Sequence, residues 1–249
     1  MLEKIFWKIR AGTSFSAPFY KSNLKDFEKI KSSFNGSQRE RFEYLYKKYS
    51  LYNWYGKISE IQFKESLFQI DTLDQLFEAS SPKTFKAMLD LGSKNWSYLP
   101  ALHSFCGGCW TGIELDGNQR YLNLSTRAAH AKRVAKDFGP SEYIVSDILN
   151  HQGSYDFITW FLPFISLGSL KSWGLPEEFY KPEEMMRHVH KLLMKKAFIV
   201  IVNQGEKEYY LQEKLLKDFP DLKVLKRGKI DALLSPFTRE RYGWLLQKI

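Results

Sequence analysis

Hydrophobic and polar positions follow two different spacings along this chain, and the change between them falls near residue 80. Before that point, apolar residues recur every three to four positions, which is the spacing of one buried face of a helix. Ser37 followed by Glu40 predicts a capping box at the start of such a helix. Its apolar face consists of Phe42, Leu45, Tyr46, Tyr49 and Tyr52.

Two further helical stretches are expected in this first part of the chain. One covers about residues 58–67, and the other covers residues 71–77 and opens with an acidic cap. A Ser-Ser-Pro sequence then forms a linker-like break. We therefore predict an N-terminal helical extension over residues 1–82 and a second domain over residues 83–249.

In the second part of the chain, short apolar runs alternate with helical stretches. Strands are expected at residues 85–91, 109–115, 143–146, 156–161, 197–202, 222–229 and 241–248. Helices are expected at 98–105, at 119–136, from Pro182 onward and at 206–219. This alternation predicts an α/β domain with a mostly parallel, seven-stranded sheet and helices on both faces.

Composition and charge narrow the class of protein. The chain has 249 residues, of which 44% are hydrophobic and 26% charged, so a disordered or collagen-like chain is excluded. The balance of 37 basic and 28 acidic residues gives +9. This excess is spread along the chain, which favours solvated faces, although a nucleic-acid surface stays open as an alternative.

The sequence also bears on the cellular location of the protein. Its longest uncharged stretch, 157–170, contains Pro163 and is too short to span a bilayer. The first ten residues carry charges between their apolar positions, so they form no signal-peptide core. Two cysteines do not make a disulfide framework. We therefore expect a cytoplasmic protein that does not bind membranes.

Candidate chemistry gathers at four strand ends. In a parallel sheet, ligands bind beyond the carboxyl ends of the strands. Gly92 follows the first predicted strand and allows a tight turn. An acidic residue after the second strand is placed to hold the two hydroxyls of a ribose. The side chains at these ends are Asp90, Gly92 and Ser93, then Glu114 and Asp116, then Asp147 and Ile148, and last Trp160, Phe161 and Pro163.

Each of these positions also has a structural interpretation. A glycine after a strand most often serves a turn, and the acids after the second and third strands are also typical helix or turn caps. Four such positions in the expected order favour a common cofactor site.

The order and spacing over residues 83–249 resemble a class I S-adenosylmethionine-dependent methyltransferase. The resemblance implies a Rossmann-like fold whose last two strands form an antiparallel hairpin. It implies that the loop of Asp90, Gly92 and Ser93 lies against the methionine part of the cofactor. It further implies that Glu114, with Asp116 nearby, holds the ribose, that Asp147 and Ile148 hold the adenine, and that Trp160, Phe161 and Pro163 line the methyl-transfer site.

The sequence departs from that family at two motifs. Lys94 and Trp96 stand where the family usually has further glycines. The residues around Pro163 lack the Asn/Asp-Pro-Pro-aromatic signature of amino-nitrogen methylation. The sequence therefore leaves open whether Trp96 contacts the cofactor or fills its pocket.

Two functions follow as hypotheses. The first is an S-adenosylmethionine-dependent methyltransferase that acts on an unidentified small or macromolecular acceptor, with the N-terminal helices as a cap. The alternative is a catalytically inactive, methyltransferase-like module that docks on RNA or protein through those helices. A nicotinamide-dependent dehydrogenase is disfavoured, because no G-x-G-x-x-G follows the first strand.

Other candidate groups have weaker support. Cys106 and Cys109 form a C-x-x-C pair near His103, but no second ligand pair follows, so structural or free thiols are favoured over a zinc or redox site. His151 is a candidate base near the site rim, and the 165–181 connection is a candidate lid. The interleaved tyrosines and lysines of residues 44–55 fit helix packing, a substrate cap or a single-stranded nucleic-acid surface.

Overall fold

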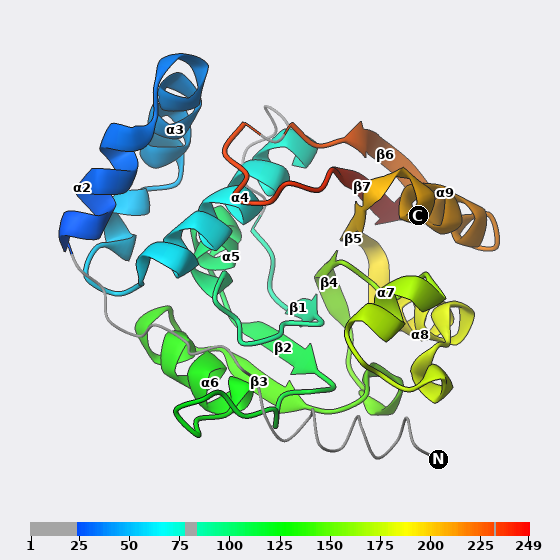
Figure 1. Ribbon diagram of the computed structural model, residues 1–249. Coiled ribbons are helices and arrows are strands. Elements are labelled where there is room, and N and C mark those ends of the chain that lie inside the picture. Colours follow the sequence, from blue (N-terminus) through cyan, green and yellow to red (C-terminus); the bar gives the residue numbers. More distant parts are fainter. Residues whose placement is uncertain (1–23, 78–83, 232) are drawn as a thin grey trace.

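The computed structural model describes residues 24–77, 84–231 and 233–249. A seven-stranded sheet in the order β3-β2-β1-β4-β5-β7-β6 runs through the molecule (Figure 1). Five strands are parallel and the last two form an antiparallel hairpin at the edge, as predicted. The strands are β1 (Met88–Leu91), β2 (Trp110–Glu114), β3 (Glu142–Val145), β4 (Tyr155–Phe161), β5 (Leu193–Gln204), β6 (Leu222–Lys229) and β7 (Arg241–Lys248).

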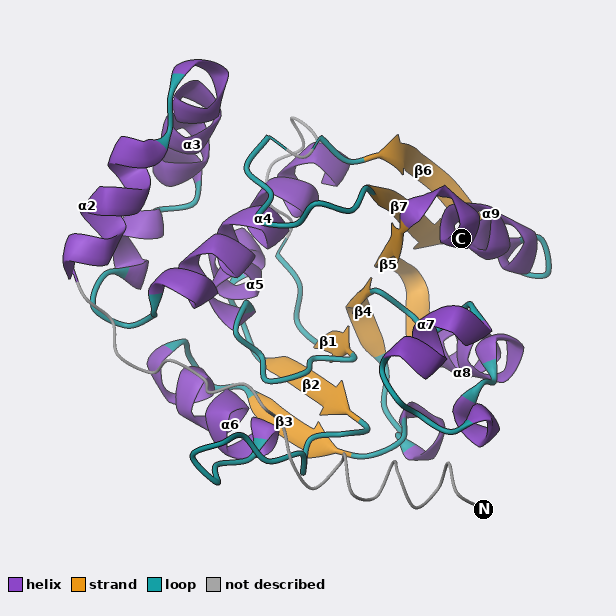
Figure 2. Cartoon of the chain, viewed as in Figure 1, coloured by secondary structure: helices purple, strands orange, loops and turns teal. Residues whose placement is uncertain are grey.

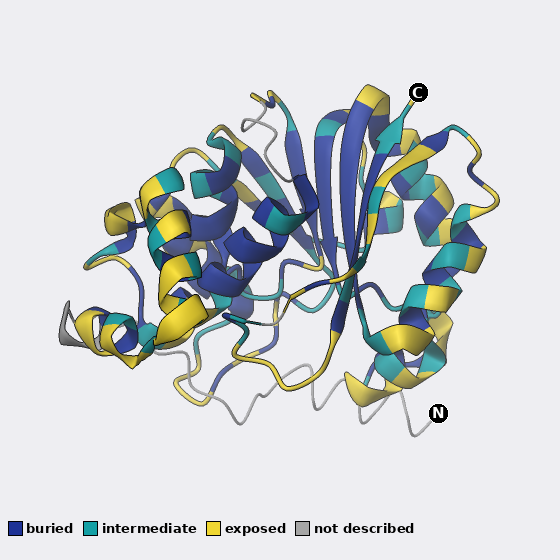
Figure 3. Cartoon of the chain, turned by 90° about the horizontal axis from the view of Figure 1, so that it is seen from above, coloured by how far each residue is buried: buried dark blue, intermediate teal, exposed yellow. Residues whose placement is uncertain are grey.

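The helices cover both faces of the sheet, which confirms the α/β prediction (Figures 2 and 3). One core lies between the sheet and α4 (Glu60–Phe77), α5 (Leu99–Cys106) and α6 (Arg127–Asp137). The other lies against α8 (Pro182–Leu192) and α9 (Gly205–Leu216). Both sets of helices bury apolar side chains against the central strands β1, β4 and β5, which are themselves buried on two faces along most of their length.

The register of the central strands positions the candidate site. Asp90 in β1 lies opposite Gly112 in β2 and Thr159 in β4. Because β1, β2, β3 and β4 are parallel, their carboxyl ends meet at one edge of the sheet. The four predicted strand ends are therefore brought together by the pairing itself.

The N-terminal part contains α2 (Leu24–Ser33), α3 (Gly36–Lys48), the short 3-10 helix η1 (Leu51–Trp54) and α4. The predicted apolar face of α3 is buried at Phe42, Leu45 and Tyr49, whereas Tyr52 is exposed. The predicted linker at 80–82 lies outside the described residues, and the division of the chain at residue 82 stays a prediction.

Two N-terminal predictions were wrong. The residue before α3 is Asn35, and Ser37 lies inside the helix, so it forms no capping box. The two helices expected between 58 and 77 are one helix, α4, and Asp71 is buried within it rather than capping a new one. Asp71 is tolerated there because Arg41 of α3 pairs with it.

The expected helix at 119–136 was also wrong in its first half. The helix α6 begins at Arg127, because the Thr126 side chain caps it by accepting a hydrogen bond from the Ala129 amide at 3.0 Å. The residues before Thr126 form a turn in which Leu124 has a φ of +62°.

The connection at 165–181, expected as a loop, contains α7 (Leu167–Ser172) and the short helix η3 (Glu177–Phe179). None of the described helices has the length and apolar character needed to cross a bilayer.

Candidate active site

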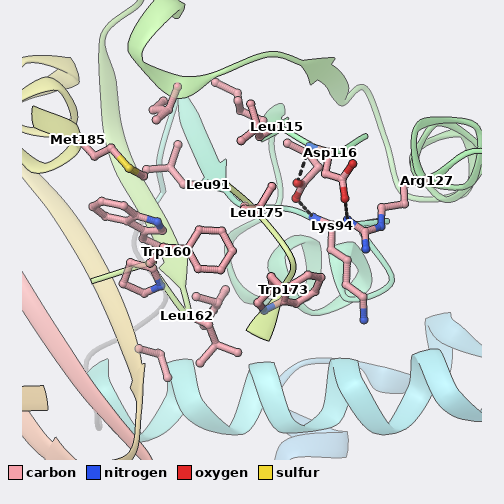
Figure 4. A pocket seen from close by; sticks show the side chains of 18 of the residues that line it. Leu91, Lys94, Leu115, Asp116, Arg127, Trp160, Leu162, Trp173, Leu175 and Met185 are labelled. Atoms are coloured by element: carbon pink, nitrogen blue, oxygen red, sulfur yellow. Dashed lines mark hydrogen bonds and ion pairs between the residues drawn. The ribbon is translucent and has the colours of Figure 1, made fainter. Parts of the chain in front are cut away.

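A cavity of about 310 Å³ opens at the carboxyl edge of the sheet (Figure 4). That volume falls at the lower end of the range for small-molecule sites. One half of the cavity is formed by the loops that follow β1, β2, β3 and β4, and the other half by α4, the 165–185 region and the β6–β7 connection. The predicted residues that line it are Gly92, Glu114, Asp116, Asp147, Ile148, Trp160, Phe161 and Pro163.

The loop after β1 has a left-handed backbone at three positions, of which only Gly92 is a glycine. Gly92 has a φ of +69°, and Lys94 and Trp96 have φ values of +52° and +55°. Left-handed φ values cost a non-glycine residue about 1–2 kcal/mol, so the surrounding structure must hold this loop in place. The Tyr143 hydroxyl does so in part, by donating a hydrogen bond to the Lys94 carbonyl.

Trp96 is fully buried and does not line the cavity. Its indole ring occupies the space beside Gly112, where an added Cβ would lie only 2.8 Å from the ring atom Cε2. The large side chain therefore packs under the loop. It neither fills the cavity nor forms its wall.

Two residues predicted to contact the cofactor lie beneath the cavity instead. Asp90 is fully buried and accepts hydrogen bonds from the Thr159 hydroxyl at 2.6 Å and the Tyr98 hydroxyl at 2.9 Å. Burial raises the pKa of Asp90 to about 7, and these hydrogen bonds limit the rise. Ser93 is also buried and donates to the Asp90 and Ile113 carbonyls. Both side chains hold the loop in position and are absent from the cavity wall.

The second strand end carries a fixed carboxylate. The Glu114 oxygens accept hydrogen bonds from the Lys94 amide at 2.7 Å and the Asp116 amide at 2.9 Å. Figure 4 shows these contacts beside Asp116, whose own carboxylate pairs with Arg127 at 3.2 Å. Because Asp116 is already paired with a cation, Glu114 is the better acceptor for ligand hydroxyls.

At the end of the third strand, Asp147 both caps a turn and lines the cavity, which are the two roles predicted for it. Asp147 caps the 3-10 helix η2 (Ile148–Asn150), where one carboxylate oxygen accepts the Leu149 amide at 3.0 Å. The same residue lines the cavity, next to the buried Ile148. The cap fixes the direction of the carboxylate, and its second oxygen accepts no hydrogen bond from any residue that the structure describes.

The fourth strand end forms an aromatic wall. Trp160 and Phe161 end β4, and Leu162 follows with a φ of +57° while its amide donates to the Val202 carbonyl at 2.7 Å. Beyond Pro163, the Phe164 ring meets Trp173 edge-on with centroids 6.3 Å apart. The wall continues to Met185 of α8 (Figure 4).

The opposite half of the cavity was missed at the sequence level. It includes Glu65, Phe68 and Gln69 of α4, together with Phe237 and Arg241 of the β6–β7 connection and β7. The sequence signal for this half is a set of polar residues among the apolar positions of 60–77, and that pattern is equally typical of helix packing. Of the N-terminal helices expected to cap the site, only α4 reaches the cavity among the described residues.

The other candidates do not join the site. His151 hydrogen-bonds the Tyr155 hydroxyl at 2.7 Å and does not line the cavity. Cys106 and Cys109 are free thiols, and burial raises the pKa of Cys106. Burial lowers the pKa of His103 to about 4, and no cluster of three metal-ligating side chains occurs within the described ranges.

Comparison with solved structures identifies the fold. Over 74% of this chain and 76% of the other, the StiE O-MT segment superimposes with a TM-score of 0.52 at 13% identity. The magnesium protoporphyrin IX methyltransferase ChlM from Synechocystis PCC 6803, solved with bound SAM, gives 0.50 at 13% identity over 91% of this chain and 99% of its own. The [4+2]-cyclase SpnF gives 0.51 at 11% identity, covering 72% and 80%.

The chain has the fold of class I, Rossmann-like methyltransferases. Identities of 11–13% show a shared fold and no more. No protein-family model matches the sequence, and no curated protein matches it. The reaction must therefore be argued from the site itself.

Proposed function

We propose that this protein is an S-adenosylmethionine-dependent methyltransferase. One observation carries the proposal: Glu114 and Asp147, at the ends of adjacent strands, face the same cavity as the Gly92 loop and the Trp160–Pro163 wall. Each carboxylate is fixed by backbone amides yet keeps accepting capacity toward the cavity. These are the hydrogen-bond acceptors that ribose hydroxyls and an adenine amino group require.

The residues present fit the cofactor. Glu114 would accept the two ribose hydroxyls, and Asp147 would accept the adenine amino group while Ile148 packs on the ring. When bound, the cofactor supplies a methyl group that a positively charged sulfur already activates. The remaining work is to align donor and acceptor and to exclude water. Trp160, Phe161 and Pro163, all three of them buried, are placed to exclude it.

Isothermal titration with S-adenosylmethionine and S-adenosylhomocysteine tests this proposal, with NAD as the control ligand. We expect micromolar binding of both adenosyl compounds and none of NAD. Glu114→Ala and Asp147→Ala should each weaken binding by about 10–100-fold, the usual cost of losing a charged hydrogen bond. Asp137→Ala removes an exposed carboxylate away from the cavity and should change nothing. Failure of both adenosyl compounds to bind would refute the proposal.

A second function is supported by one feature of α3 and η1. Tyr44 and Tyr52 are 45% and 52% exposed, in a segment that also carries Lys47. Exposed rings beside basic residues suit single-stranded RNA, as in an inactive methyltransferase-like module that docks through its N-terminal helices. A matched screen separates the two functions: RNA binding that Tyr44→Ala and Tyr52→Ala abolish, with no methyl transfer to any acceptor class, would favour the module.

A further inference from the structure

Arg241 is a buried cation on the far wall of the cavity. The residue lines the cavity and is only 7% exposed. One guanidinium nitrogen, Nη1, donates to the Arg239 and Glu240 carbonyls at 3.1 and 3.2 Å. No carboxylate of the described chain lies within ion-pair distance of this guanidinium. A buried charge with only backbone partners is costly unless a ligand completes its environment.

The carboxylate that acts on Arg241 through space does not neutralise it. Glu208 favours the charged guanidinium through space, yet burial still lowers the pKa of Arg241. The two Glu208 oxygens already accept hydrogen bonds from the Ser166 hydroxyl at 3.2 Å and the Gln204 amide at 3.0 Å. The planar fork of Arg241 is therefore left for a carboxylate or phosphate, the groups that match its geometry.

Gln69 gives a second, independent sign of a ligand on the same wall. It lines the cavity at 9% exposure, and its amide oxygen Oε1 is buried without a hydrogen-bond partner in the described chain. A buried acceptor of this kind costs free energy until a donor reaches it. A ligand hydroxyl or amino hydrogen would satisfy it.

Aromatic rings connect these two polar groups. Phe68, next to Gln69 on α4, meets Phe237 edge-on with centroids 5.3 Å apart. The Arg241 guanidinium carbon lies 5.1 Å from the centre of the Phe237 ring. Rings of this kind favour a flat, apolar ligand body between the polar contacts. Figure 4 shows α4 across the cavity from Leu115 and Asp116, so this wall is separate from the proposed cofactor corner.

We propose that the methyl acceptor is a small aromatic anion. Its carboxylate or phosphate binds Arg241, its ring lies against Phe68 and Phe237, and a hydroxyl or amino hydrogen reaches Gln69 Oε1. This inference rests on the proposed methyltransferase function, because it identifies the second ligand of the cavity as the acceptor.

The test measures binding to protein saturated with S-adenosylhomocysteine. The probes are 2-naphthoate, 2-naphthyl phosphate, the neutral isostere 2-naphthamide and the non-aromatic cyclohexanecarboxylate. One or both naphthyl anions should bind about 10–100-fold more tightly than 2-naphthamide, the range expected for a charged hydrogen bond. Cyclohexanecarboxylate should bind more weakly than 2-naphthoate. Tighter binding of 2-naphthoate indicates an acceptor with a carboxylate, and tighter binding of 2-naphthyl phosphate indicates one with a phosphate.

Arg241→Gln should abolish the preference for anions while leaving 2-naphthamide affinity unchanged. Arg239→Gln removes a cation two positions away that is exposed and outside the cavity, so it should keep the preference. Unchanged affinity for S-adenosylhomocysteine reports that Arg241→Gln is folded. If that variant does not fold, Arg241→Lys keeps a charge without the fork and should lower 2-naphthoate affinity but not 2-naphthamide affinity.

The outcomes distinguish a failure of this inference from a failure of the proposed methyltransferase function. Binding of S-adenosylhomocysteine with no preference for anions in the wild-type protein overturns the acceptor class and leaves the methyltransferase proposal standing. A preference that survives Arg241→Gln but is lost in Lys94→Gln places the anion on the opposite wall and overturns the role of Arg241. Anion binding without binding of S-adenosylhomocysteine overturns both proposals.

Discussion

At the scale of single residues, three of the six described non-glycine residues with left-handed φ values lie in loops that border the cavity. Lys94, Trp96 and Leu162 are non-glycine residues with left-handed φ values, and all three lie in the loops that follow β1 and β4. Such residues persist only where neighbours hold them in place. Burial of Trp96 beside Gly112 and the hydrogen bond from Leu162 to Val202 provide that support. A glycine-poor loop can therefore keep the backbone path that glycines usually provide.

Asp90 leads to a prediction about pH. Burial raises its pKa to about 7 in the folded protein, whereas an unfolded aspartate titrates near 3.9. A carboxyl group with a raised folded pKa stabilises most below the unfolded pKa, and that stability is lost as pH rises through the folded pKa. Between pH 4 and 8 the wild-type protein should lose up to about 4 kcal/mol relative to Asp90→Asn.

Urea unfolding of both proteins at intervals from pH 4 to 8 measures this difference. Asp137→Asn changes an exposed carboxylate and should follow the wild-type curve. Parallel curves for the wild type and Asp90→Asn would mean that Asp90 stays ionised in the folded protein throughout this range.

At the scale of elements, α3 and α4 are joined by buried ion pairs. Arg41 of α3 donates to Asp71 at 2.7 Å and lies 2.8 Å from Asp74, both of them on α4. Lys48 and Tyr49 also donate to Asp74. Burial alone would raise the pKa of Asp74, but these donors hold it below its usual value, whereas burial dominates at Asp71 and raises its pKa. The packing of α3 on α4 therefore depends on Arg41.

Arg41→Met should destabilise the protein by about 3–5 kcal/mol, because it leaves the buried Asp71 without its cation. The double variant Arg41→Met/Asp71→Asn should recover much of that loss. Chemical denaturation gives the free energies for this cycle, with the exposed Arg39→Met on the same helix as control. A cost for Arg41→Met no larger than that of the control would show that α3 does not need these pairs.

Elements differ in how far their sequence determines them. The last two strands were predicted at their observed limits. The first half of the 119–136 helix was wrong because Tyr121, Leu124 and Ala128 recur at helical spacing. The Thr126 cap decides where α6 begins. Asp71 was taken for a cap because its partner, Arg41, is distant in sequence and only the tertiary packing brings the two together.

At the scale of the whole molecule, pairing order explains which part of the site could be predicted. Residues after β1, β2, β3 and β4 must meet at one edge once the strands are parallel, so the positions of Gly92, Glu114 and Asp147 follow from the topology. Gln69 and Arg241 meet them only because α4 and the β6–β7 connection fold over that edge. The solved structures that share this fold include a [4+2]-cyclase, so the fold alone leaves the reaction open.

This division of the cavity predicts a pattern of hydrogen exchange across the molecule. S-adenosylhomocysteine should slow amide exchange in residues 92–98, 114–118 and 146–150, which surround the proposed cofactor corner. At a ligand concentration 100 times the dissociation constant, amides that exchange through opening of the site should slow by up to about 100-fold. Residues 217–221, at the amino edge of the sheet, should exchange unchanged.

Adding 2-naphthoate to that complex should extend the protection to residues 65–69 and 237–241, which line the second wall. The same experiment with Arg241→Gln should lose the second protection and keep the first, because the two ligands occupy different halves of one cavity. Protection of the second wall by S-adenosylhomocysteine alone would instead mean that a single ligand fills the whole cavity, and the acceptor would then have to enter from another direction.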